Sequence, residues 1–186
     1  MASLVQQYYD RFRPFLPRRK GTYHGYVARD DRLLDLTTSR PDYKEGLVRA
    51  LRRIAPGRTV CIVGFGRGIT SMIATETGAK SVTSYEASRE MVKIGLESFR
   101  INNVSANALT VNHALVGSAV DIYGSPEGAA SVSPDDIDPK EVLVLECEGS
   151  ELSILRGLSR LPDYFVVETH PSKGAPTAGV CRTIRE

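Results

Sequence analysis

Short apolar runs alternate with helical patterns over most of the chain. The runs are four or five residues long and occupy residues 60–63, 81–85, 108–111, 142–145 and 164–167. Such runs predict strands, and uniformly apolar strands are typical of a parallel sheet that is covered on both faces. The pattern therefore predicts an α/β fold, a doubly wound, Rossmann-like and mostly parallel sheet with helices on both faces.

Apolar residues at helical spacing fill the intervals between these runs. Ser88 is a suitable N-cap for one helix, and Gly78 is placed to end another. An earlier helix is expected to begin near Pro41, and a last one near Val180. Residues 117–140 are rich in Gly, Ser, Pro and Asp, so we expect them to be irregular, with a flap over the site as one interpretation.

The chain divides into two parts that differ in sequence pattern and in net charge. Residues 1–57 are expected to form a helical N-terminal cap, and residues 58–186 a Rossmann-like domain. The first part carries 12 Lys and Arg against 6 Asp and Glu, a net charge of +6, and the second carries 12 against 16, or −4. A basic segment with aromatic residues can meet a phosphate-bearing partner, but we expect its aromatic residues to pack on the domain. These residues are Tyr8, Tyr9, Phe12 and Phe15.

Composition narrows the class of protein. The chain has 186 residues, 41% hydrophobic and 25% charged, which fits one globular domain and excludes disordered, collagen-like and coiled-coil chains. Its three Cys are too few for a disulfide framework, none has CxxC spacing, and we expect no metal. No stretch approaches the roughly 20 apolar residues that span a bilayer. We therefore expect a cytoplasmic location and no membrane partner.

Polar residues follow several predicted strands, at the edge where a doubly wound sheet binds ligands. Gly64, Gly66 and Gly68 follow the first strand, and alternate glycines let the backbone approach a ligand with its amides. Glu86 ends the second strand, where its two oxygens can accept hydrogen bonds from both hydroxyls of a ribose. Ile69 stands where a dinucleotide fingerprint has its third glycine. The spacing therefore predicts a nucleoside site and is typical of class I methyltransferases that bind S-adenosylmethionine.

Three later segments resemble one methyltransferase family. Residues 142–157 resemble the D-x-E-G-x-E-x-x-x-L-x-G signature of the FkbM-like family of class I S-adenosylmethionine-dependent methyltransferases. Residues 165–171 resemble the E-x-H-P segment that follows this signature in the family. Residues 112–117 are similar to the segment after the third strand of the family. The resemblance covers residues 42–172 and implies S-adenosylmethionine as the cofactor, with O-methylation of a sugar or another small hydroxylated metabolite. Residues 58–186 are then expected to form an S-adenosylmethionine-binding, Rossmann-like domain. The resemblance also implies a cofactor site made by Gly64, Phe65, Gly66, Gly68, Glu86, Ala87, Asn112, His113 and Ala114.

The same resemblance assigns parts of the donor to these residues. It places the methionine end at the 64–68 loop, the ribose at Glu86, the adenine near residues 112–114, and the transferring methyl near Glu146 and Glu148. The chain departs from the family at Ile62, where an Asp is usual, and at Glu146, where the family has Asp. The antiparallel strand pair that normally completes the sheet is also missing, so a homo-oligomer that covers the open edge is one expected partner.

Four side chains at the ends of later strands are candidates for the group that takes the proton of an alcohol acceptor: Glu146, Glu148, Glu168 and His170. We favour Glu148 as the acceptor-site carboxylate and His170 as a base or orienting group, and we expect Cys147 to point the opposite way, into the core. The leading function is methylation of a small-molecule or glycan hydroxyl. Two alternatives stay open. The basic N-terminus favours an RNA methyltransferase. Ile62 and the missing C-terminal strands favour a catalytically silent nucleoside-binding module.

Overall fold

The computed structural model describes residues 8–9, 11–118, 125–137 and 141–185 of the chain. Its main body is a six-stranded sheet in the order β7-β6-β5-β4-β8-β9, and every neighbouring pair of strands is parallel. The expected doubly wound fold is confirmed. The strands are β4 (Thr59–Val63), β5 (Ser81–Glu86), β6 (Leu109–Val116), β7 (Ala130–Val132), β8 (Val142–Leu145) and β9 (Tyr164–Val167).

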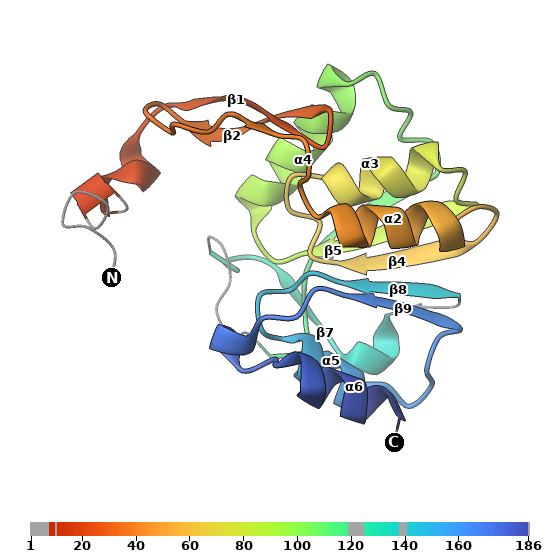
Figure 1. Ribbon diagram of the computed structural model, residues 1–186. Helices are drawn as coiled ribbons and strands as arrows, with labels where there is room; N and C mark the ends of the chain where they lie inside the picture. The colour runs from red at the N-terminus through yellow and green to blue at the C-terminus, as the bar shows by residue number, and fades with distance from the viewer. Residues whose placement is uncertain (1–7, 10, 119–124, 138–140, 186) are drawn as a thin grey trace.

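Helices cover both faces of this sheet (Figure 1). Ser88 caps one of them as predicted, because its Oγ accepts a hydrogen bond from the backbone N–H of Met91 at 3.4 Å. One face carries α2 (Glu45–Ile54), α3 (Ile69–Glu76) and α4 (Arg89–Ile101), and the other carries α5 (Glu151–Gly157) and α6 (Thr177–Arg185). Short 3₁₀ turns lie at η1 (Arg13–Phe15), η2 (Pro134–Asp136) and η3 (Pro171–Lys173).

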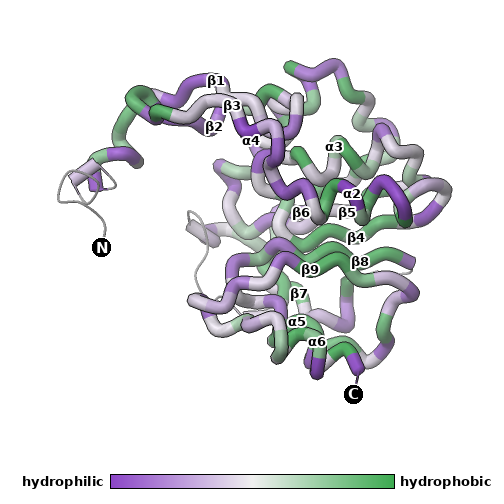
Figure 2. Tube along the Cα trace, in the orientation of Figure 1, coloured by the Kyte–Doolittle hydropathy of each residue, from purple (hydrophilic) through white to green (hydrophobic). Residues whose placement is uncertain are grey.

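The sheet separates two apolar cores, because successive residues of a strand point to opposite faces. In β4, Val60 and Ile62 pack in the core that contains residues of α2, α3 and α4. Cys61 and Val63 pack in the other core, with residues of α5 and α6. Figure 2 shows the central strands β4 and β8 as hydrophobic along their length. Two covered faces therefore explain why these strands are apolar at every position.

Residues 18–40 form a second, three-stranded sheet, which corrects the expectation of a helical N-terminal cap. β1 (Arg18–Tyr23) pairs antiparallel with β2 (Tyr26–Arg32), and β3 (Ser39–Arg40) pairs parallel with β1. His24 and Gly25 have φ values of 48° and 90°, which suits the tight turn of a hairpin. The hairpin β1–β2 lies beside α4 and extends beyond the body of the molecule (Figure 1).

Other boundaries differ from the sequence prediction for local reasons. Helix α2 begins at Glu45 and not near Pro41, because Lys44 has a left-handed φ of 52°. Strand β6 continues to Val116 because its last three residues pair with β7, which lies within the segment expected to be irregular. Residues 119–124 and 138–140, on which the expected flap depends, lie outside the described residues.

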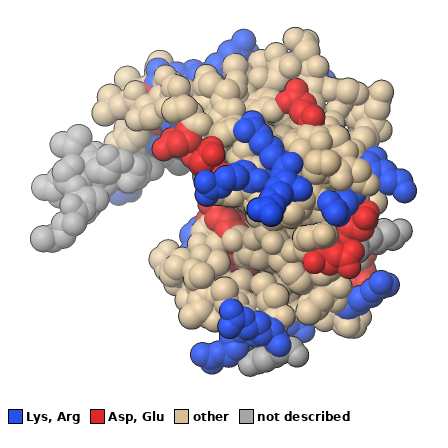
Figure 3. All heavy atoms as spheres, turned by 45° about the vertical axis from the view of Figure 1, so that its right-hand side comes forward, with Lys and Arg blue, Asp and Glu red and all other residues tan. Residues whose placement is uncertain are grey.

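Many basic side chains of the N-terminal part form ion pairs within it, as at Arg13–Asp35, Arg18–Asp30 and Arg40–Asp31. The aromatic residues Tyr8, Phe12 and Phe15 are 57–83% exposed, so the expectation that they pack on the domain is wrong for them. Helix α2 carries exposed arginines on its outer side, and Figure 3 shows Lys and Arg side chains gathered on that side of the molecule.

Strand β9 forms one edge of the main sheet. Among the described residues no antiparallel strand joins this sheet, and Tyr164 of β9 is 39% exposed. A second copy covering this edge stays a prediction. No helix within the described ranges is long and apolar enough to cross a membrane.

Candidate functional site

Three predicted site residues lie side by side at the ends of strand β4 and its two neighbours. β4 pairs with β5 on one side and with β8 on the other, and the last residues of the strands are in register. Gly64, Glu86 and Glu146 therefore lie together at the carboxyl edge of the sheet. The chain runs outward through β5, β6 and β7 before it returns to β8, so the strand order reverses between β4 and β8. Doubly wound sheets bind ligands at this kind of switch point.

The loop after β4 needs glycine for its conformation and for its close contacts. Gly64, Gly66 and Gly68 have φ values of 101°, 51° and 77°, which other residues rarely adopt. A Cβ on Gly64 would collide with the backbone oxygen of Glu146. A Cβ on Gly68 would lie 3.0 Å from the backbone oxygen of Gly95 in α4. The glycines therefore let the end of β4 approach both β8 and α4.

Glu86 is held at the end of β5 by two backbone amides. The N–H of Gly66 donates to one carboxylate oxygen at 2.9 Å, and the N–H of Ser88 donates to the other at 2.8 Å. Burial raises the pKa of Glu86 above its ordinary value, and the hydrogen bonds from the amides of Ser88 and Gly66 oppose this rise. Each carboxylate oxygen can accept a further hydrogen bond, so the orientation of Glu86 is fixed while acceptor capacity remains.

A cavity of about 300 Å³ opens between these strand ends. Its volume lies at the lower end of the range for small-molecule sites. Apolar side chains of α4 and β6 form part of its wall, namely Met91, Ala114, Leu115 and Val116. Eight of the thirteen predicted site residues line it: Gly64, Phe65, Gly66, Glu86, Ala87, Ala114, Glu146 and Glu148.

The other five predicted residues lie outside the lining: Gly68, Asn112, His113, Glu168 and His170. Asn112 Nδ2 donates to the backbone oxygen of Ser84 at 3.5 Å, so its side chain contacts the neighbouring strand. Nε2 of His113 lies 3.1 Å from the backbone oxygen of Ala87, directly after Glu86. His113 therefore contacts the backbone that follows the predicted ribose ligand.

Lys44 is a cavity-lining cation that the sequence analysis missed. Its Nζ lies 2.8 Å from Glu146 and 2.5 Å from Glu168, and the second oxygen of Glu146 accepts a hydrogen bond from Thr70 Oγ1 at 2.6 Å. Burial lowers the pKa of Lys44, but Glu146, Tyr43 and Glu168 outweigh this effect and raise it above its ordinary value. The partners of Lys44 are 102 and 124 residues away in the chain, so no local pattern identifies it.

The chain after β8 turns sharply at the rim of the cavity. Glu148 and Gly149 have φ values of 54° and 109°, and a Cβ on Gly149 would lie 2.6 Å from the backbone oxygen of Lys173. The ammonium of Lys173 donates to the carboxylate of Glu148. The loop after β9 is therefore packed against the turn that presents Glu148.

Cys147 packs against the core that contains residues of α5 and α6, as expected, and it also lines the cavity together with Glu146 and Glu148. Strand β8 ends at Leu145, two residues before Cys147. Burial raises the pKa of the Cys147 thiol well above its ordinary value. The protonated thiol is a poor nucleophile.

His170 contacts a buried carboxylate at the start of α5. Its Nδ1 atom lies 2.6 Å from Oε1 of Glu151, whose side chain is fully buried. This contact joins residues 142–157 to residues 165–171, the two segments in which the sequence resembles the FkbM-like signature. His170 is thus fixed beside α5, at the end of β9.

Three acidic and two basic side chains line the cavity, which leaves an excess of one negative charge. They are Glu86, Glu146, Glu148, Lys44 and Arg67. Within the part of the chain that the structure describes, no group of three or more His, Cys, Asp or Glu side chains is arranged to hold a metal ion.

Solved structures share this fold, although no protein-family model and no curated protein matches the chain. A putative methyltransferase complexed with SAH aligns with a TM-score of 0.57 and 13% identity, over 90% of this chain and 46% of that one. A putative S-adenosylmethionine-dependent methyltransferase from Streptococcus mutans aligns with a TM-score of 0.53 and 12% identity, over 90% and 45%. A ribosomal protein L11 methylase from Lactobacillus delbrueckii subsp. bulgaricus aligns with a TM-score of 0.51 and 18% identity, over 76% and 65%.

These similarities concern the fold. The chain has the Rossmann-like architecture of S-adenosylmethionine-dependent methyltransferases, and it spans less than two thirds of the length of each of these three neighbours.

Proposed function

We propose that this chain binds S-adenosylmethionine and transfers its methyl group. The observation that carries the proposal is one cavity that joins the glycine loop after β4 to the oriented, buried carboxylate of Glu86 after β5. A glycine loop lets backbone amides approach a ligand, and a carboxylate can accept hydrogen bonds from both hydroxyls of a ribose. Neighbours of the same fold, one of them complexed with SAH, support the same donor.

The chemistry of the cavity wall fits this donor. S-adenosylmethionine carries a net positive charge near neutral pH, because its sulfonium and amino groups outweigh its carboxylate. The negative excess of the lining attracts such a ligand. The apolar wall formed by Met91, Ala114 and Leu115 suits a flat adenine ring.

We further propose that the acceptor is a hydroxyl group of a small molecule or glycan, as the FkbM-like resemblance implies. When bound, S-adenosylmethionine supplies an electrophilic methyl group, so the chain has to align the acceptor and take its proton. Glu148 suits this role because its side chain lines the cavity and is 44% exposed. Lys173 donates to one oxygen of Glu148, which leaves the other oxygen for the acceptor. Glu146 is less suited because Lys44 and Thr70 each bind one of its oxygens, and Glu168 lies outside the cavity lining. In this proposal the carboxylate of Glu148 accepts the hydroxyl proton, and His170 helps to position the loop after β9.

Calorimetric titration with S-adenosylhomocysteine tests the donor site. We expect the unmodified chain to bind, and Glu86→Ala to weaken binding by about 1.5–3 kcal/mol, the range for hydrogen bonds to a charged group. Glu97→Ala is the matched control, because Glu97 pairs with Arg29 at the surface and lies outside the cavity lining, so its loss should leave the affinity unchanged. No heat of binding at millimolar ligand would remove the donor from the proposal.

Glu148→Gln tests the acceptor role with a hydroxylated compound that supports formation of S-adenosylhomocysteine. We expect kcat to fall by about 10²- to 10⁴-fold, the usual contribution of a general base, while S-adenosylhomocysteine still binds. Mass spectrometry of the product locates the methyl group on oxygen, nitrogen or carbon. An unchanged kcat, or a product methylated elsewhere than on oxygen, contradicts this part of the proposal.

The two alternatives differ from this proposal in measurable ways. An RNA acceptor requires free basic surface, but several N-terminal arginines are paired with Asp, and the exposed arginines of α2 lie on its outer side. A silent nucleoside-binding module binds S-adenosylhomocysteine and forms no methylated product with any acceptor.

A further inference from the structure

The hairpin β1–β2 contacts the glycine loop through one long side chain. Arg67 lies between Gly66 and Gly68, and its Nη2 atom is 2.5 Å from Oδ2 of Asp30 in β2. Arg67 is also part of the cavity lining. The N-terminal sheet therefore reaches the wall of the proposed donor site.

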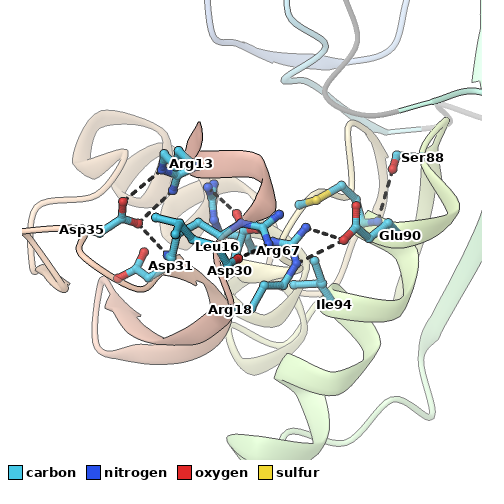
Figure 4. A network of polar contacts seen from close by, with 12 residues as sticks. Arg13, Leu16, Arg18, Asp30, Asp31, Asp35, Arg67, Ser88, Glu90 and Ile94 are labelled. Carbon is cyan, nitrogen blue, oxygen red and sulfur yellow. Dashed lines mark hydrogen bonds and ion pairs between the residues drawn. The ribbon is translucent and has the colours of Figure 1, made fainter. Parts of the chain in front are cut away.

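Asp30 is fully buried between two guanidinium groups. Arg18 of β1 donates to its other oxygen and also pairs with Glu90 of α4 at 2.6 Å. Figure 4 shows these side chains converging where the hairpin meets the start of α4. A carboxylate without solvent contact is stable only with such partners, and its removal leaves the contacting cations poorly compensated. Asp30 is therefore the carboxylate that Arg18 and Arg67 share.

Arg67 also links the hairpin to the aromatic wall of the cavity. Its Nη1 atom donates to the hydroxyl of Tyr43 at 3.3 Å, and Tyr43 lines the cavity. The guanidinium lies 4.8 Å from the ring centre of Tyr23, a buried residue of β1. Tyr23 and Tyr43 contact each other edge to face, with ring centres 5.1 Å apart. A shift of Arg67 would therefore disturb both tyrosines.

The backbone beside Arg67 carries the amide that orients Glu86. The N–H of Gly66 donates to Glu86 at 2.9 Å, and Gly66 has no side chain to restrict its own conformation. The residues on either side of it are anchored: Phe65 stacks on Phe99 of α4 with ring centres 6.3 Å apart, and Arg67 is held by the hairpin. The direction of the Gly66 amide therefore depends on both anchors.

We propose that Asp30 is a positioning residue for donor binding. It holds Arg67, and through Arg67 the glycine loop and the Gly66 amide, in the arrangement that receives the donor. Donor binding and docking of the hairpin β1–β2 then stabilise each other, because a coupling between two sites acts equally in both directions. This inference rests on the proposed function of the cavity.

Asp30→Asn tests the coupling, because it preserves the shape of the side chain and removes its charge. We expect the dissociation constant of S-adenosylhomocysteine to rise about 2- to 30-fold, the range for substitutions that modulate coupling between sites. Hydrogen exchange supplies a readout that a merely structural role would not change. In the unmodified chain, S-adenosylhomocysteine is expected to slow exchange of the β1–β2 amides, and in Asp30→Asn only the amides near β4 and β5 should still respond.

Glu90→Gln is the matched control, because it removes the other, exposed partner of Arg18 and keeps the contact between Asp30 and Arg67. It should change neither the affinity nor the protection of the hairpin. If Asp30→Asn does not fold, Arg67→Gln tests the same contact from the loop, where the side chain is 25% exposed, and should give the same loss. Unchanged affinity in the variant that folds, or hairpin protection that persists in it, overturns this inference alone. Absence of binding to the unmodified chain overturns the proposed function as well.

Discussion

Glu86 shows how one side chain can be both buried and available. Two amides fix its orientation, yet its burial raises the pKa above the ordinary value for a glutamate. A raised pKa in the folded state means that the ionised form opposes folding near neutral pH, and that this opposition disappears as the pH falls through the raised pKa. Only the ionised carboxylate accepts hydrogen bonds from both hydroxyls of a ribose.

The affinity for S-adenosylhomocysteine is therefore expected to fall as the pH is lowered from neutrality through the raised pKa of Glu86, at a higher pH than an ordinary glutamate would give. Protonation of Glu86 removes a hydrogen-bond acceptor for the ribose, but it makes the contribution of Glu86 to folding more favourable. A loss of affinity at low pH therefore reflects weaker binding at Glu86 and not unfolding caused by this residue. Calorimetric titrations across this range measure the effect. Glu86→Gln should bind weakly without this pH dependence, and a flat profile for the unmodified chain would contradict the assignment.

At the scale of elements, the junction of β4 with β8 sets the shape of the site. Gly64 and Gly78 both have positive φ values, 101° and 89°. A Cβ on Gly64 meets the backbone of Glu146, whereas a Cβ on Gly78 meets nothing within 4 Å. The two glycines therefore separate the effect of backbone conformation from the effect of close contact.

Gly78→Ala is expected to lower the free energy of unfolding by about 1–2 kcal/mol, the range for a side chain in a left-handed conformation. Gly64→Ala should lower it by more and also abolish binding of S-adenosylhomocysteine, because the ends of β4 and β8 have to separate. Chemical denaturation and calorimetry of the two variants give the comparison. Equal losses of stability, or intact binding in Gly64→Ala, would show that the contact with Glu146 is unimportant.

The elements that could be predicted from the sequence are those with apolar faces. Strands β8 and β9 have the predicted bounds, because both cores require apolar residues at successive positions. The hairpin β1–β2 was missed because its buried positions include Asp30 and Asp31, whose charges are compensated by arginines. In the sequence alone, two aspartates indicate solvent-exposed positions. β7 was missed because three residues in a polar segment carry too little pattern.

At the scale of the whole molecule, only those site residues that lie at the ends of strands could be predicted from the sequence. The rule that ligands bind beyond the carboxyl ends of parallel strands brought Gly64, Glu86 and Glu146 together. It gave no sign of Lys44 or of the pair between Arg67 and Asp30. The chain has 24 Lys and Arg and 22 Asp and Glu, so charge alone does not select which distant residues meet.

Strand β4 stands between the two halves of the site, with β5 and Glu86 on one side and β8 and Glu146 on the other. It is buried in both cores, whereas the turn after β8 lines the cavity and the loop after β9 packs against that turn. Under the proposed function, recognition of the nucleoside therefore depends on the strand that is buried in both cores, and contact with the second reactant depends on the turn after β8. In that case a change of acceptor requires new side chains in that turn alone, while β4 continues to serve the donor.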